Sequence, residues 1–186
     1  MLIDQDVRQR RSGQHRFYSI MYKFKTTMKT YVLTLSQHFP ATHPKKGQPT
    51  LFMEKILHGI KVHTIRANYN LWENRIEQVQ RGEAVLSLRY WTGKPYASKQ
   101  VEFAQVTKEH GVGIQMLTFG RAYNPKTDDW DGEYDLRLGT VDDEVHASPW
   151  LLAKNDGLDV VDWADWFKNY DLSKPMAIIH FTKFRY

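Results

Sequence analysis

The sequence contains no cysteine among its 186 residues. Disulfide bonds and thiolate metal sites are therefore excluded, while a reducing compartment is permitted. No stretch of the chain approaches the roughly 18 consecutive apolar residues that a membrane-spanning helix needs. The first residues also lack the apolar core of a secretory signal peptide. These absences predict a cytoplasmic protein that does not associate with membranes.

The sequence motifs of several enzyme classes are missing as well. There is no P-loop, no G-x-G-x-x-G before a helix and no G-x-S-x-G. No H-E-x-x-H occurs, and no close pair among the eight histidines has acidic support. The sequence thus predicts no cofactor and no metal. The alternative is a metal site in the part of the chain that holds His38, His43, His58 and His63.

The net charge of +5 resides in the first 30 residues, which hold seven Lys or Arg side chains and two acidic ones. The rest of the chain holds 19 basic and 19 acidic residues, which cancel. Residues 1–27 are therefore predicted to be a flexible basic leader that can attract phosphate groups. Two alternatives stay open: a solvated leader without function, or translation that begins at Met21 or Met28.

Periodicity and turn residues predict the order of the elements in the remaining chain. A helix at 50–59 is predicted to start at an N-cap Thr50 and to stop at Gly59. Strands are expected at 29–39, 83–91, 99–108, 113–119 and 174–186, with a short one at 59–66, and further helices at 70–82, 148–157 and 159–170. Residues 83–108 are predicted to form a β-hairpin.

Residues 120–146 differ from their surroundings because they are acidic, rich in turn residues and poor in aliphatic side chains. We interpret them as an insert, with a short hairpin across Glu133–Leu138 and Thr140–His146. Few strands alternate with full crossover helices, which argues against a doubly wound sheet. The expected fold is a single α+β domain over residues 28–186, built on a small, partly open β-barrel flanked by helices.

The segment GIKVHTIR, residues 59–66, places a lysine, a histidine, a threonine and an arginine close together after a glycine. In a flat strand Lys61 and His63 would share one face, and Thr64 and Arg66 the other. Lys61 and Thr64 can therefore act together only if the chain turns between them.

The pattern Gly-x-Lys-x-x-Thr-x-Arg, here Gly59, Lys61, Thr64 and Arg66, resembles the ASCH domain of the PUA-like superfamily. The helix before it and the hairpin after it agree with that family. The later Asp156-Gly157-Leu158 step before a last helix and the closing strand AIIHFTKF are similar to it as well. The resemblance covers roughly residues 30–119 and 147–186, and leaves out the leader and the insert.

This resemblance implies a PUA-like barrel whose cleft holds RNA or a modified nucleoside. One branch of the family is an amidohydrolase that removes the acetyl group from N4-acetylcytidine with a lysine, a threonine three positions later and a glutamate. Lys61 and Thr64 match the first two catalytic residues. Asp156 lies near the place of the third, with a side chain one methylene shorter. Thr64 would be the nucleophile, Lys61 its base, and Asp156 would orient the lysine or move a proton.

A binding function gives the same residues other roles. Lys61 and Arg66 would contact phosphates or base edges, and Thr64 and His63 would donate or accept hydrogen bonds. The hairpin would add ligand contacts through Arg89, and Tyr90, Trp91 or Tyr96 would stack on a base.

The leading hypothesis is a protein that binds RNA or a modified nucleoside around GIKVHTIR. The alternatives are an amidohydrolase that acts through Lys61, Thr64 and Asp156, and a protein-interaction module whose acidic insert mimics or excludes nucleic acid. Structural roles also stay open: GIKVHTIR as a surface strand, His63 as a satisfied hydrogen-bonding group, and Asp156 as part of an ordinary helix end. The sequence does not predict the oligomeric state.

Overall fold

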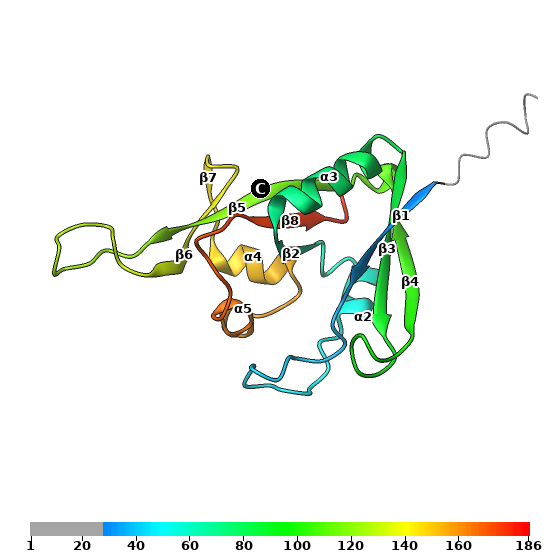
Figure 1. Ribbon diagram of the computed structural model, residues 1–186, viewed down its shortest axis with the longest axis horizontal. Coiled ribbons are helices and arrows are strands. Elements are labelled where there is room, and N and C mark those ends of the chain that lie inside the picture. Colours follow the sequence, from blue (N-terminus) through cyan, green and yellow to red (C-terminus); the bar gives the residue numbers. More distant parts are fainter. Residues whose placement is uncertain (1–27) are drawn as a thin grey trace, which may run out of the picture.

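A computed structural model describes residues 28–186, so the predictions for the basic leader lie outside the described residues (Figure 1). The helices are α2 (Phe52–Leu57), α3 (Tyr69–Gln80), α4 (Pro149–Asn155), α5 (Val160–Phe167) and the short 3-10 helix η2 (Lys108–His110). The strands are β1 (Lys29–Thr34), β2 (His63–Ala67), β3 (Ala84–Trp91), β4 (Gln100–Val106), β5 (Gly113–Arg121), β6 (Tyr134–Val141), β7 (Val145–His146) and β8 (Met176–His180). In this part of the chain no helix combines the length and the hydropathy that a membrane crossing requires.

The strands form two sheets, which confirms the α+β class. The smaller sheet has the order β1-β3-β4, with β1 parallel to β3 and the predicted β3–β4 hairpin antiparallel. The larger sheet is antiparallel and has the order β2-β8-β5-β6-β7. Within residues 28–186 the two sheets do not join into one closed barrel.

Strand β8 lies between two hydrophobic cores, and all of its residues are buried. Ala177 and Ile179 face the core that contains α3 and the three-stranded sheet. Met176 and Ile178 face the other core, which contains α4 and α5. Alternate side chains of a strand point to opposite faces, so one short strand serves both cores. Strand β2 pairs with β8 and forms the edge of its sheet, between the two halves of the molecule (Figure 1).

The predicted start of helix α2 is wrong by one residue. The N-cap is Leu51, which has a left-handed backbone and makes no side-chain cap. Thr50 is buried; its hydroxyl donates to the carbonyl oxygen of Ser36 at 2.6 Å and accepts from the N–H of Phe52 at 3.4 Å. The threonine thus links α2 to the segment after β1.

The insert contains a short hairpin, β6 with β7, but the predicted position of its turn is wrong, because β6 runs without interruption through Gly139 and Thr140. Strand β6 pairs with β5, and the two strands extend the larger sheet into an arm that projects from the body (Figure 1). The turn falls later, at Asp142 and Asp143, which both have left-handed backbones. The Asp142 carboxylate accepts a hydrogen bond from the backbone N–H of Met116 at 2.7 Å, which fixes this turn on β5.

Candidate functional site

Lys61 is held in the interior by the turn after α2. Gly59 ends that helix with a φ of 70°, a left-handed conformation that favours glycine. The carbonyl oxygen of Lys55 accepts hydrogen bonds from the N–H groups of Ile60 and Lys61, at 2.8 and 3.0 Å. Only 1% of Lys61 is exposed, and its ammonium lies 4.2 Å from the centre of the Phe52 ring. Lys61 is therefore fixed in the interior before β2 begins.

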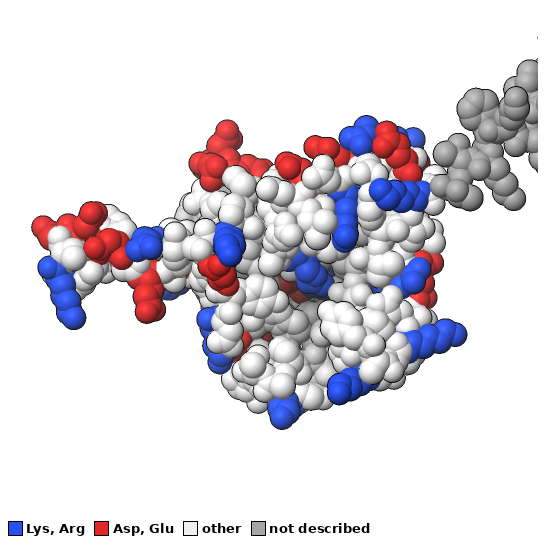
Figure 2. Space-filling model, in the orientation of Figure 1, with Lys and Arg blue, Asp and Glu red and all other residues white. Residues whose placement is uncertain are grey.

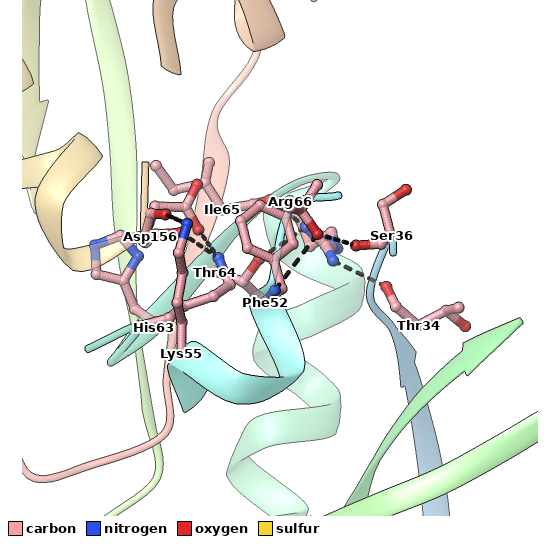
Figure 3. A network of polar contacts seen from close by, with 12 residues as sticks. Thr34, Ser36, Phe52, Lys55, His63, Thr64, Ile65, Arg66 and Asp156 are labelled. Atoms are coloured by element: carbon pink, nitrogen blue, oxygen red, sulfur yellow. Dashed lines mark hydrogen bonds and ion pairs between the residues drawn. The ribbon is translucent and has the colours of Figure 1, made fainter. Parts of the chain in front are cut away.

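Asp156 supplies the buried counter-charge. It follows α4 directly, and its carboxylate forms an ion pair with the Lys61 ammonium. The same ammonium donates to the Asp156 carbonyl oxygen at 2.6 Å. The Lys55 ammonium donates to the carbonyl oxygen of Gly157 at 2.7 Å. Lys55 thus contacts both loops (Figure 3). Its carbonyl oxygen accepts from the loop that carries Lys61, and its ammonium donates to the loop that carries Asp156.

Because Gly157 has no side chain, the loops that carry Lys61 and Asp156 can pack closely at this point. Replacement of Gly157 by alanine is therefore expected to destabilise the protein. The φ of Gly157 is 76°, and an added Cβ would lie 3.0 Å from the Cβ of Lys61. Gly47 has a similar φ of 78° but no atom within 4 Å of such a Cβ, so Gly47→Ala is the matched control for backbone strain. Chemical denaturation should show a loss of about 1 kcal/mol for Gly47→Ala and about 1 kcal/mol more for Gly157→Ala. Equal losses would mean that the loops do not press on each other at this point.

Thr64 and Arg66 lie on one face of β2, as the alternation predicts. Arg66 Nη1 donates to the Thr64 hydroxyl oxygen at 2.8 Å, and Nη2 donates to the carbonyl oxygen of Thr34 at 3.0 Å. Arg66 therefore ties the edge of the larger sheet to β1 of the smaller one (Figure 3). Burial raises the pKa of Asp156, Lys61 and Arg66 oppose this shift, and the Thr64 hydroxyl opposes it least. Lys61 and Thr64 thus both act on Asp156, because the turn precedes β2.

The charges of the buried pair are strongly affected by their surroundings. Burial lowers the pKa of Lys61 from 10.5 to about 8, although the Asp156 carboxylate opposes this shift. Burial likewise raises the pKa of Asp156, against the effect of Lys61. Both directions favour the neutral forms, so the lysine can release a proton close to neutral pH.

His63 faces the opposite side of β2 and is fully buried. Its Nε2 lies 2.8 Å from the hydroxyl of Tyr186, to which the Asn155 side chain also donates at 3.2 Å. The His63 ring packs against His180, at 5.7 Å between ring centres. Burial lowers the pKa of His63 well below its usual value, and the pKa of His180 to about 3. Both histidines are therefore neutral, and His63 supports the site from inside the protein.

The two buried histidines, His63 and His180, predict that the folded protein loses stability at acid pH. The unfolded chain binds their protons near pH 6.5 and the folded chain does not, so the free energy of unfolding should fall as the pH drops below about 6.5. The slope is about 1.4 kcal/mol per pH unit for each histidine. Denaturant titrations between pH 7.5 and 4.5 measure it. His180→Leu should reduce the slope, and the exposed control His58→Gln should not. A wild-type stability that stays constant down to pH 4.5 would contradict this prediction.

The predicted ligand contacts on the β3–β4 hairpin are placed on the smaller sheet. Arg89 donates to the Ser87 hydroxyl at 2.8 Å and lies 3.7 Å from Glu102. Trp91 contacts Tyr96, which is 92% exposed. Among the described residues no hydrogen bond or ion pair joins Arg89, Trp91 or Tyr96 to Lys61, Thr64 or Asp156. Their roles in ligand binding stay predictions.

A hollow opens on the face of the molecule shown in Figure 2, between α2 and the smaller sheet on one side and α4 and α5 on the other. Basic and acidic surface both appear in its depth. Arg66 is only partly buried, whereas Lys61 and Asp156 are 1% and 4% exposed. The rings of Phe52 and Trp166 pack against each other, 5.6 Å between centres. Sequence reasoning missed Phe52, Lys55, Asn155 and Tyr186, because only the fold brings them to this place.

Known proteins give no further guide to these residues. Comparisons of the chain with protein-family models, with curated proteins and with solved structures find no match.

Proposed function

We propose that the protein is an amidohydrolase that removes an acyl group from an exocyclic amino group of a nucleobase, with N4-acetylcytidine as the test substrate. We further propose that its two sheets form a partly open PUA-like fold of the ASCH type. The observation that carries the proposal is the buried constellation of Lys61, Asp156 and Thr64, in which burial lowers the pKa of the lysine to about 8. Perturbed titratable groups beside a hydroxyl are typical of catalytic sites.

The hydrogen bonds around Thr64 suit a nucleophile. A hydroxyl group offers one hydrogen and two acceptor positions. Arg66 donates to the oxygen at 2.8 Å, which stabilises negative charge there and leaves the hydroxyl hydrogen available for transfer. The Lys61–Asp156 pair is thus placed to accept that proton as a unit.

In the proposed first step, the Thr64 oxygen attacks the acyl carbon while its proton passes to the Lys61–Asp156 pair. The carbon–nitrogen bond then breaks, and the pair returns the proton to the leaving amino group. The acyl group is left on Thr64 as an ester. In the second step water attacks this ester, the pair takes a proton from the water, and Thr64 recovers its hydrogen as the carboxylic acid leaves. Arg66 supplies donors for the negative oxygen of each intermediate.

This mechanism predicts a basic limb in the pH profile. The pair takes up the Thr64 proton on Lys61, which can accept it only in its neutral form, and the pKa of Lys61 is about 8. The value of kcat/KM for N4-acetylcytidine should therefore rise with pH and level off above about 8. Initial rates between pH 6 and 10 measure this. An activity that is independent of pH across this range would exclude the pair as the base.

Mass spectrometry of N4-acetylcytidine incubated with the protein tests the function itself. The wild type should release cytidine and acetate, and Lys61→Met should not. The exposed-lysine variant Lys126→Met is the control and should match the wild type. No release of cytidine by the wild type between pH 7 and 9 would contradict the amidohydrolase.

Binding of RNA or a nucleoside without catalysis is the second candidate, and Arg66 favours it because this residue is only partly buried. Lys61, however, is paired and 1% exposed, so its charge is not free for a phosphate group. RNA retention that falls steeply with salt, without turnover, would support this candidate.

A further inference from the structure

A second cavity lies at the end of β2, where α3 begins. It is bounded by residues 67–70 on one side and by Tyr170, Lys174 and Met176 on the other. Its volume is about 510 Å³, within the range of about 300–1,000 Å³ that is usual for small-molecule sites. The cavity is large enough for a planar ring system with a sugar.

This cavity begins one residue beyond Arg66 of the proposed active site. Arg66 directly precedes Ala67, the first residue of its wall, on the same strand. Tyr170 also lies in the wall. A ligand bound at Arg66 would therefore need to extend only past the end of β2 to enter the cavity.

Two tyrosines from distant parts of the chain stand in its walls. The Tyr69 hydroxyl donates to Glu73 at 2.9 Å, which fixes that ring at the start of α3. Tyr170 is 41% exposed, and one side of its ring packs on Phe167 with 5.0 Å between ring centres. Exposed aromatic surface in a cavity of this size is suited to stacking on a base.

The charges of the cavity are nearly balanced. Lys174 forms an ion pair with Asp171 at 3.0 Å, and both side chains are largely exposed. The lysine is therefore not a strong site for a phosphate group. This cavity therefore offers stacking on a nucleobase, and not neutralisation of the phosphate backbone of a nucleic acid.

We propose that this cavity holds the base of the nucleotide next to the acylated one, so that the substrate is a modified nucleotide within a single strand and not a free nucleoside. The inference rests on the proposed function for the identity of the first nucleotide. It goes beyond that function in assigning a second binding site and in naming a strand as the substrate.

Equilibrium binding tests the cavity independently of turnover. Unmodified cytidine and a fluorescent cytidine trinucleotide are titrated into the full chain and into Tyr170→Ala, Tyr170→Phe and Tyr123→Ala. Tyr123 is a matched control, because it is 46% exposed but lies in the segment that joins β5 to β6, outside the cavity lining. The wild type should bind the trinucleotide at least about 10-fold more tightly than cytidine. Tyr170→Ala should lose this advantage, whereas Tyr170→Phe and Tyr123→Ala should keep it.

Turnover of N4-acetylcytidine, free and within the trinucleotide, is measured alongside. If neither substrate is deacetylated but the trinucleotide keeps its Tyr170-dependent advantage, the amidohydrolase fails and the cavity stands. If both ligands bind equally, or if Tyr170→Ala leaves the advantage intact, the cavity proposal is overturned whatever the turnover shows. Circular dichroism of each variant establishes that the fold is retained.

Discussion

Asp156→Asn is expected to lower the free energy of unfolding by about 3–5 kcal/mol at pH 7, because it leaves the Lys61 ammonium buried without its counter-charge. The loss should shrink at higher pH. Without the carboxylate, the pKa of Lys61 falls further in the folded state, while the unfolded chain keeps its ordinary value. The unfolded state then holds the extra proton, so the stability of the variant rises with pH. Denaturant titrations at pH 7 and 9.5 measure both effects.

The control for this variant is Asp171→Asn, which makes the same chemical change in the exposed ion pair with Lys174. Exposed pairs contribute little, so this change should have almost no effect. The double variant Lys61→Met with Asp156→Asn removes the charge that is left unpaired, and should recover most of the loss. A small loss for Asp156→Asn that does not change with pH would show that water reaches the pair.

Local sequence was sufficient for the features that depend on neighbouring residues. Gly59 and Gly157 end helices because both need left-handed backbones, and their sequence positions after α2 and α4 predict this. The alternation of β2 places Thr64 and Arg66 on one face, where they are joined by a hydrogen bond. The alternation also set the condition that Lys61 and Thr64 could act together only if the chain turns between them, but it did not predict that the strand would begin only at His63.

Other features depend on contacts between distant segments and leave no local pattern. Lys55 reads as an ordinary helical lysine, but it bonds to Gly157, 102 residues away. Tyr186 is 123 residues from His63, whose ring it contacts. The N-cap prediction failed by one residue because Leu51 adopts the left-handed backbone that precedes the helix. The Thr50 hydroxyl accepts a long hydrogen bond from Phe52 N–H at 3.4 Å and donates to Ser36, 14 residues away, a contact that no local pattern predicts.

The burial of Lys61 distinguishes between the two proposed functions, amide hydrolysis and nucleic-acid binding, more clearly than the sequence does. A lysine that attracts phosphate needs its charge in solvent, where counterion release drives binding. Lys61 is instead under the Phe52 ring and paired with Asp156. Such a lysine costs free energy to bury, and a lowered pKa is what makes it useful as a base. Arg66 keeps the permanent charge at the partly exposed position.

Thr64→Val should have the largest effect on activity, a fall in kcat of at least about 1,000-fold, because it removes the proposed nucleophile while it keeps the branched shape. The fold should tolerate the change with a loss of about 1–3 kcal/mol, since Arg66 Nη1 still donates to the Ile65 carbonyl oxygen. Rates of N4-acetylcytidine deacetylation at pH 8.5, with denaturation curves for each variant, measure both quantities.

Thr64→Ser is the matched variant, because it keeps the hydroxyl and removes one methyl group. It should retain activity within about 10-fold of the wild type, and it should form an acyl-serine ester that mass spectrometry of the intact chain detects as a mass increase. A Thr64→Val variant that turns over as fast as the wild type would move the nucleophile elsewhere. In that case water, activated by the Lys61–Asp156 pair, would attack the acyl carbon directly, and Thr64 would serve only to position Asp156.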